Sequence, residues 1–204
     1  NPSLVGSEMC IRDRLYPYAA EDPAAAQAWV EATNNHFGGF DSVIHSAGIF
    51  SRVPLLFEPG EEQDIAHTIN VNLMGPWWLT RAAWPQLVAH GEGRIQVLVS
   101  MSGKRSKGRL AAYSASKFAL LGLCQTMRNE GWAAGIRVTA ICPGWVNTDM
   151  AAAVRRGPSD RWPTQSMDAE AMTQPEDIAS MSAELLRLPN RAVPFELAVS
   201  SSLE

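Results

Sequence analysis

The sequence predicts an α/β fold in which parallel strands form one sheet and helices cover both of its faces. Short apolar stretches rich in Val and Ile alternate along the chain with longer stretches of helical periodicity. Gly or Pro residues separate most of these stretches. Strands that alternate with helices join into a parallel sheet through crossover connections. Strands that are short and apolar throughout are typical of strands buried on both faces, so three layers are expected.

Composition is typical of one folded domain. The chain has 204 residues, of which 46% are hydrophobic and 19% are charged. Its mild net charge of -4 lacks the basic excess typical of nucleic-acid-binding domains, so we expect no nucleic-acid partner. No apolar run is long enough to span a membrane and no signal peptide is evident, so we expect no membrane association.

Cysteine and histidine residues suggest neither a disulfide framework nor a metal site. The three cysteines form no Cys-x-x-Cys pair. The four histidines are scattered and make no ligand pair at helical spacing. We therefore expect reduced thiols, a cytoplasmic location and no bound metal.

The first fourteen residues, NPSLVGSEMCIRDR, follow neither strand nor helix periodicity. Residues 9–14 read like a translated sequencing-adaptor end rather than coding sequence. We expect residues 1–14 to be a non-native leader and residues 15–204 to form a single domain.

Four helices and four strands are predicted after the leader. Pro23 falls in the first turn of the first helix, and Thr173 is expected to cap the last one, with Glu176 and Asp177 in its first turn. The predicted helices cover residues 22–36, 61–88, 110–132 and 175–188, and the predicted strands cover residues 40–45, 94–100, 136–142 and 195–199.

Tyr113 and Lys117 give the strongest local signal for chemistry. They stand four residues apart early in a predicted helix, so both side chains lie on one face. An ammonium near a phenol favours the phenolate and lowers the tyrosine pKa from about 10 toward neutral pH. Tyr113 is therefore a candidate general acid and base. The pair alone also fits a surface tyrosine beside a solvated lysine, so its surroundings must decide.

Two further polar residues support a site near this pair. Ser100 ends a predicted strand thirteen residues before Tyr113. Ligands bind at the carboxyl ends of strands in open α/β sheets, so its hydroxyl could meet a substrate oxygen, although it could also simply cap the loop. Asn72 lies among apolar residues of a predicted helix and needs partners if it is buried; otherwise it is a surface amide.

The segment after the third predicted strand completes the candidate site. In residues 143–148 (PGWVNT), Gly144 lets the backbone approach a ligand, and the Thr148 hydroxyl can meet a phosphate or an amide. Residues 147–166 are predicted to be irregular. Their apolar members suggest either a cover over a substrate cavity or a plain surface loop; they are Met150, Trp162 and Pro163.

These residues together resemble the short-chain dehydrogenase/reductase family, in its order and spacing, over nearly all of residues 15–204. The resemblance implies a Rossmann-like, doubly wound parallel sheet in three α/β/α layers, here N-terminally truncated and lacking the first βαβ unit. Four blocks carry it: His45-Ser-Ala-Gly48 where the family has Asn-Asn-Ala-Gly; Asn72 at its helix asparagine; Ser100, Tyr113 and Lys117 at its serine, tyrosine and lysine; and Pro143, Gly144 and Thr148 at its Pro-Gly and threonine.

The resemblance implies an NAD(P)-dependent oxidoreductase that interconverts a carbonyl and a secondary alcohol by hydride transfer. It gives catalytic roles to four residues. Tyr113 would exchange a proton with the substrate oxygen, and Ser100 would orient that oxygen. Lys117 would hold the nicotinamide ribose and lower the tyrosine pKa, while Asn72 would hold a water that links Lys117 to solvent. The implied contacts to NAD or NADP are His45, Ala47, Gly48, Tyr113, Lys117, Pro143, Gly144, Val146 and Thr148.

One departure from the family bears on cofactor binding. No Gly-rich phosphate-binding turn precedes His45, and the residues that would select NAD or NADP belong to the same region. We therefore expect the isolated chain to bind cofactor weakly and to leave the strand at residues 40–45 with an open apolar edge. Ser46 replaces the second asparagine, which is expected to weaken a link between strands without abolishing it.

Two other functions stay open. Other chemistry with the same tyrosine, such as epimerisation or dehydration, is one, and a non-catalytic fragment or binding module is the other. The complete set of four catalytic residues argues against a binding module, because binding alone needs no tuned phenol. The expected partner is a small carbonyl or alcohol substrate. A homodimer or homotetramer paired through the helices at 61–88 and 110–132 is also expected.

Overall fold

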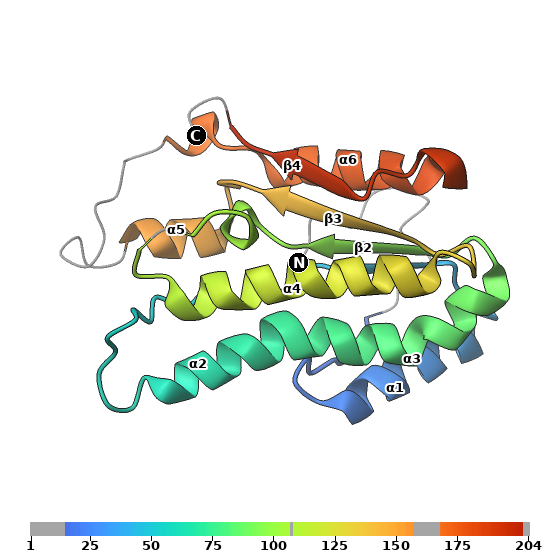
Figure 1. The fold of residues 1–204 in the computed structure, drawn as a ribbon, viewed down its shortest axis with the longest axis horizontal. Coiled ribbons are helices and arrows are strands. Elements are labelled where there is room, and N and C mark those ends of the chain that lie inside the picture. Colours follow the sequence, from blue (N-terminus) through green and yellow to red (C-terminus); the bar gives the residue numbers. More distant parts are fainter. Residues whose placement is uncertain (1–14, 107, 157–167, 202–204) are drawn as a thin grey trace.

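The computed structural model describes residues 15–106, 108–156 and 168–201, so the expected leader lies outside the described residues. Within them, one parallel sheet has the strand order β1-β2-β3-β4 (Figure 1). The strands are β1 (Ser42–His45), β2 (Arg94–Leu98), β3 (Arg137–Pro143) and β4 (Glu196–Val199). Every crossover contains a helix, as the alternation in the sequence predicts.

Helices cover both faces of this sheet, which confirms the three-layer α/β prediction. Figure 1 shows α1, α3 and α4 on one side of the sheet and α6 on the other. The helices are α1 (Pro23–Phe37), α2 (Glu62–Ile69), α3 (Gly75–His90), α4 (Ala111–Gly131), α5 (Asp149–Arg156) and α6 (Pro175–Arg187). None of those in the described part of the chain is long and apolar enough to cross a membrane.

The core follows from the alternation of side chains along β3. Val138, Ala140 and Cys142 face the larger cluster, which includes apolar residues of α1, α3 and α4. Ile141 points to the opposite face and packs with Ile178 of α6. Successive strand residues point to opposite faces, so one apolar strand supplies both interfaces.

Helix ends follow local sequence signals, with one correction. Gly38 and Gly91 end α1 and α3 in left-handed conformations with φ of 77° and 81°, which glycine adopts without steric cost. The prediction that Thr173 caps the last helix is wrong. Gln174 is the cap, in a reciprocal capping box with Asp177. Pro175 takes the first helical position, and the residue directly before it therefore becomes the cap.

Two predicted segments differ in the structure. The helix expected at residues 61–88 is α2 and α3 joined by a π-helical turn at Asn70–Met74. The prediction of an irregular segment at 147–166 is wrong for Asp149–Arg156, which form α5. Its apolar residues recur at helical spacing, and that periodicity outweighs the surrounding Arg and Pro. Residues 157–167, with Trp162 and Pro163, lie outside the described part.

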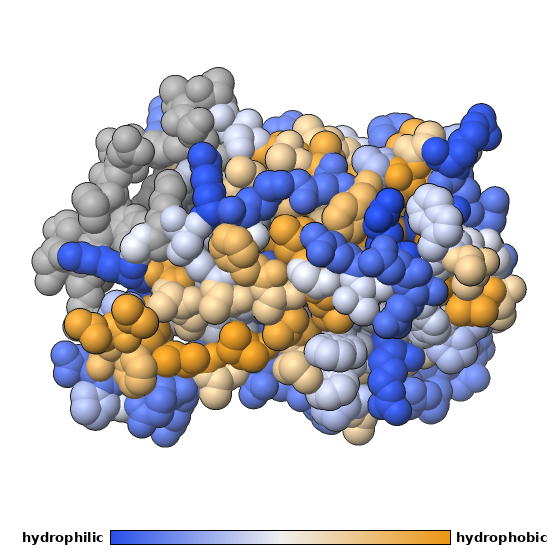
Figure 2. All heavy atoms as spheres, in the orientation of Figure 1, coloured by the Kyte–Doolittle hydropathy of each residue, from blue (hydrophilic) through white to orange (hydrophobic). Residues whose placement is uncertain are grey.

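Some apolar side chains remain at the surface. Ile44 of β1, at one edge of the described sheet, is 43% exposed. Leu55 and Leu56 are 80% and 88% exposed in the loop before α2. Figure 2 shows apolar side chains gathered at the lower left, where Figure 1 draws this loop.

Candidate active site

A pocket of about 390 Å³ lies at the carboxyl ends of the strands, where parallel strands bring their following loops together. Three of the four predicted catalytic residues line it, namely Ser100, Tyr113 and Lys117. Five of the predicted cofactor contacts line it too: Gly48, Pro143, Gly144, Val146 and Thr148. Most of the predicted site residues thus line one cavity at the carboxyl ends of the strands, as their positions after the strands predict.

Tyr113 stands in the first turn of α4 and is 9% exposed. Its ring packs against Phe50, with the ring centres 4.9 Å apart. Burial raises the pKa of Tyr113, because it penalises the phenolate, whereas a side-chain hydrogen bond with Ser100 acts to lower the pKa. The net shift is therefore opposite to the expected lowering, and Lys117 is not among its causes, so the effect of Lys117 on this pKa stays a prediction.

Lys117 follows one turn later and is 5% exposed. Its Nζ donates to the Leu98 carbonyl at 3.1 Å and lies 5.8 Å from the centre of the Tyr113 ring. Burial lowers the pKa of Lys117 to about 8, against the smaller opposing influence of Cys124 and Cys142. An ammonium has three donors, so two remain beyond the one given to Leu98.

Ser100 has an unusual backbone. Its φ of 140° and ψ of 155° lie in a region that residues other than glycine rarely adopt. Its hydroxyl accepts from the Ser102 N–H at 3.0 Å and caps the short helix Met101–Gly103. Gly103 holds that helix against α4, because a Cβ there would lie 2.7 Å from the Lys117 carbonyl oxygen. The geometry of Ser100 is therefore set by packing against the helix that carries Tyr113.

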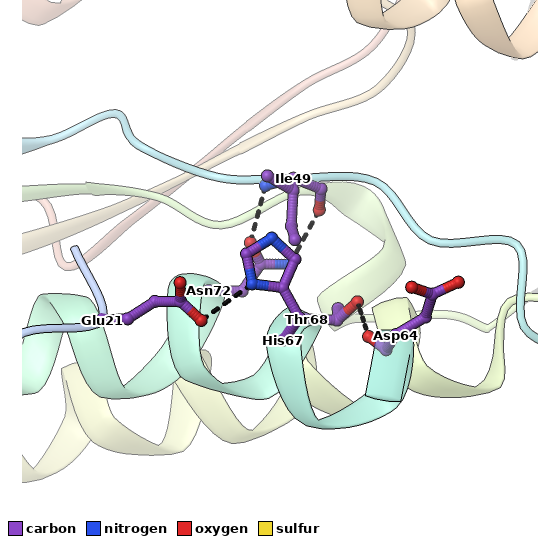
Figure 3. A network of polar contacts seen from close by, with 6 residues as sticks. All are labelled: Glu21, Ile49, Asp64, His67, Thr68 and Asn72. Carbon is purple, nitrogen blue, oxygen red and sulfur yellow. Dashed lines mark hydrogen bonds and ion pairs between the residues drawn. The ribbon is translucent and has the colours of Figure 1, made fainter. Parts of the chain in front are cut away.

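Asn72 is fully buried in the π-helical turn, but it does not line the pocket. Its Oδ1 accepts from the Ile49 N–H at 2.8 Å, and its Nδ2 donates to the Ile49 carbonyl at 2.9 Å (Figure 3). Nδ2 also lies 3.1 Å from Ser116 Oγ, which in turn donates to the Tyr113 carbonyl. The side chain thus ties the loop after β1 to α4. Its proposed water-holding role stays a prediction.

His45 and Ala47 do not line this pocket. The His45 ring is buried at the end of β1, with Nε2 2.9 Å from Thr80 Oγ1. Burial lowers the pKa of His45 to about 4, so the ring is neutral near pH 7. Their assignment as cofactor contacts therefore stays a prediction. Ser46, between them, does line the pocket.

The structure adds residues that sequence reasoning missed. Phe50, Arg105, Leu110 and Trp145 line the pocket, and Ser116 holds the Asn72 amide. Arg105 carried a usable signal, because it lies in the loop between a strand-end serine and the catalytic tyrosine candidate. Of the apolar residues expected in a cover, Met150 lines the pocket.

The pocket fits the nicotinamide end of a dinucleotide. At Gly48, a Cβ would lie 3.4 Å from Asn72 Oδ1 and 3.5 Å from Lys117 Nζ, so the missing side chain leaves room beside the lysine. The ammonium of Lys117 and the hydroxyl of Thr148 are donors of the kind that ribose hydroxyls and a carboxamide require. Among the described residues, no group of three or more His, Cys, Asp or Glu side chains could hold a metal ion.

Known proteins of similar sequence carry the names of a reductase and an oxidoreductase. Agropine synthesis reductase of Rhizobium rhizogenes is 35% identical over 180 residues, which make up 86% of this chain and 38% of that protein. Oxidoreductase UcpA of Salmonella typhimurium is 31% identical over 179 residues, 86% of this chain and 62% of that protein. The chain thus spans less than two thirds of the length of both relatives.

A solved structure has the same fold. An actinorhodin polyketide ketoreductase with NADPH superimposes with a TM-score of 0.77 at 28% identity, covering 90% of this chain and 74% of that one. The model of the family described as "short chain dehydrogenase" matches residues 11–159, well over half of the sequence. The chain therefore belongs to the short-chain dehydrogenase family.

Proposed function

We propose that the chain carries the catalytic part of an NAD(P)-dependent oxidoreductase that interconverts a carbonyl and a secondary alcohol. The observation that carries this proposal is the single pocket that Ser100, Tyr113 and Lys117 line together. A phenol, a hydroxyl and an ammonium in one cavity can bind a substrate oxygen and move a proton to or from it.

The raised pKa of Tyr113 favours a role as proton donor. Because its phenol is protonated near neutral pH, it can give a proton to the oxygen of a carbonyl that is being reduced. Ser100, within hydrogen-bonding reach of the same phenol, would orient that oxygen. Lys117, Gly144, Val146 and Thr148 would hold the nicotinamide end of the cofactor. When bound, the nicotinamide supplies or accepts the hydride.

The same residues set limits on the alternatives. A binding module has no need for a phenol and a hydroxyl paired inside a cavity. Epimerisation or dehydration could use the same tyrosine, but the names of the relatives, a reductase and an oxidoreductase, favour redox chemistry. The choice between NAD and NADP stays outside the proposal, although the similar ketoreductase was solved with NADPH.

A two-fold assembly through the long helices is part of the same proposal. Trp77 of α3 and Phe118 of α4 are 47% and 45% exposed, which leaves large apolar side chains available for a partner copy. Light scattering after size exclusion measures the assembly directly. A monomer at micromolar concentration contradicts it.

Tyr113→Phe tests the catalytic assignment in the full-length protein. The phenyl ring keeps the packing against Phe50 but removes the proton. With a panel of ketones and NADPH or NADH, we expect at least about a 100-fold loss of kcat. Tyr16→Phe is the matched control, because Tyr16 is 42% exposed and lies outside the pocket. An unchanged rate in Tyr113→Phe overturns the proposal.

A further inference from the structure

The described charged side chains that line the pocket are all positive. Among its described lining residues, the charged side chains are Lys117 and Arg105, and none is Asp or Glu. Lys117 is buried at the base and donates to the Leu98 carbonyl. Much of the remaining wall is apolar, including Phe50 and Leu110. Arg105 itself is exposed, so a ligand that enters the pocket can reach its guanidinium from the solvent side.

Arg105 differs from the cations beside it. Lys104 forms an ion pair with Glu196 of β4. Arg52 donates to the carbonyl of Val154, a residue that lines the pocket. The Arg105 backbone N–H donates to the Met101 carbonyl at 3.0 Å, but its guanidinium has no hydrogen bond or ion pair within residues 15–106, 108–156 and 168–201. Its donors are thus available to a ligand.

The position of Arg105 points to the substrate. It lies in the loop that begins at Ser100 and ends at α4, which carries Tyr113. A molecule whose carbonyl meets these two residues can present another group to Arg105 within the same 390 Å³ pocket. The planar guanidinium matches a carboxylate with two parallel hydrogen bonds. A phosphate carries nearly twice the charge and three oxygens, and it commonly needs more donors than one guanidinium.

We propose that Arg105 binds a carboxylate of the substrate, so that the enzyme acts on small oxo acids or the corresponding hydroxy acids. This inference rests on the proposed oxidoreductase function. It adds the substrate class and assigns Arg105 as the residue that selects it.

The test compares an oxo acid with its methyl ester in the full-length protein. Arg105→Gln removes the charge and is expected to lower kcat/KM for the acid by about 10- to 100-fold, mainly through KM, with little effect on the ester. Arg105→Lys keeps the positive charge but cannot form two parallel hydrogen bonds to a carboxylate. It should therefore recover part of the kcat/KM that Arg105→Gln loses. Lys104→Gln is the matched control, because its partner is Glu196, and it should alter neither substrate.

Three results overturn this inference. The first is an equal effect of Arg105→Gln on acid and ester, which makes the residue a structural one. The second is an equal loss of NADPH affinity, which places Arg105 at the cofactor. The third is a larger loss of kcat/KM in Arg105→Gln for an oxo phosphate of similar chain length than for the oxo acid. That result would make a phosphate, and not a carboxylate, the group that Arg105 binds.

A binding measurement separates this inference from the proposed function. Trp145 lines the same pocket, so quenching of tryptophan fluorescence can report binding of the acid without turnover. Saturable quenching that Arg105→Gln abolishes, in a protein that reduces no carbonyl, upholds the anion site and refutes the reaction. Turnover of carbonyls with no preference for acids upholds the reaction and refutes the anion site.

Discussion

Lys117 directs its ammonium at the backbone of Leu98, with Nζ 3.1 Å from the carbonyl oxygen, while the centre of the Tyr113 ring is 5.8 Å away. Burial then reverses the order of the two pKa values and moves them apart. It raises that of Tyr113 and lowers that of Lys117 to about 8. The phenol is protonated at neutral pH, whereas the lysine exchanges its proton in the mildly alkaline range.

Lys117→Met is expected to stabilise the fold at pH 7. The pKa of Lys117 falls from an ordinary value of 10.5 to about 8, so burial of its charged form is unfavourable. The unfolded chain binds more protons between these two values, and stability therefore rises with pH across that window. After loss of the hydrogen bond to Leu98, we expect a net gain of about 1–2 kcal/mol at pH 7. The gain should shrink as the pH rises from 8 toward 10.5.

Urea denaturation of both proteins at pH 7 and pH 9.5 measures this change. A variant that is less stable than wild type at pH 7, or a gain that grows with pH, contradicts the pKa assigned to Lys117.

Ser100→Gly and Ser100→Ala separate backbone strain from catalysis. Both remove the hydroxyl that bonds Tyr113, so both should lose activity. Alanine keeps the strained φ of 140°, whereas glycine relieves it. Strain of this kind costs about 1–3 kcal/mol, so Ser100→Gly should be more stable than Ser100→Ala by about 1 kcal/mol. The usual order is the reverse, because glycine loses more entropy on folding. If thermal unfolding shows Ser100→Ala to be more stable than Ser100→Gly, the backbone at Ser100 is not strained.

Periodicity and glycine positions predict most of this fold. The short apolar stretches form the parallel sheet. Gly38 and Gly91 end α1 and α3, because glycine readily adopts the left-handed conformation found there. The π-helical turn that holds Asn72 was not predictable, because one extra residue per turn leaves no trace in a helical pattern. Residues 149–156 were assigned as loop because Arg and Pro surround a stretch whose helical spacing is too short to stand out.

The candidate site was predictable as far as strand ends and spacing determine it. Ser100 and Lys117 share a pocket because one follows a parallel strand directly and the other lies in the second turn of the next long helix. The direction of the Tyr113 pKa shift was missed because burial depends on Phe50, which lies far away in sequence. His45 illustrates the same limit, since its buried partner, Thr80, comes from α3.

His45 should make the protein sensitive to mild acid. Its pKa is lowered from 6.5 to about 4, so the unfolded chain takes up the proton first as the pH falls. The stability that the neutral ring contributes is present above pH 6.5 and is lost between pH 6.5 and 4. At pH 5 this loss amounts to about 2 kcal/mol. His45→Gln keeps an amide nitrogen near Thr80 and has no proton to gain.

Chemical denaturation at pH 7 and pH 5 checks this expectation. Wild type should lose about 2 kcal/mol more than His45→Gln between the two values. His67→Gln serves as the control, because His67 is exposed and pairs with Glu21 at the surface. Identical acid sensitivity in wild type and His45→Gln refutes the buried, neutral state of His45.

Gly103→Ala should weaken both fold and activity. A Cβ at this position would lie 2.7 Å from the Lys117 carbonyl oxygen and 2.7 Å from Val99 Cγ1, so backbone must move to admit it. Overpacking of this kind costs about 1–3 kcal/mol. The displaced turn of α4 carries Lys117, and the displaced loop begins at Ser100, so kcat/KM should fall as well.

Gly122→Ala provides the matched comparison for Gly103→Ala. Gly122 lies within α4, where a Cβ would have no neighbour within 4 Å, so alanine there should stabilise the helix by up to about 1 kcal/mol and leave the rate unchanged. Thermal unfolding and steady-state rates of both variants decide the matter. If Gly103→Ala unfolds at the temperature of wild type with an unchanged kcat/KM, the close contact between the Ser100 loop and α4 does not position the catalytic groups.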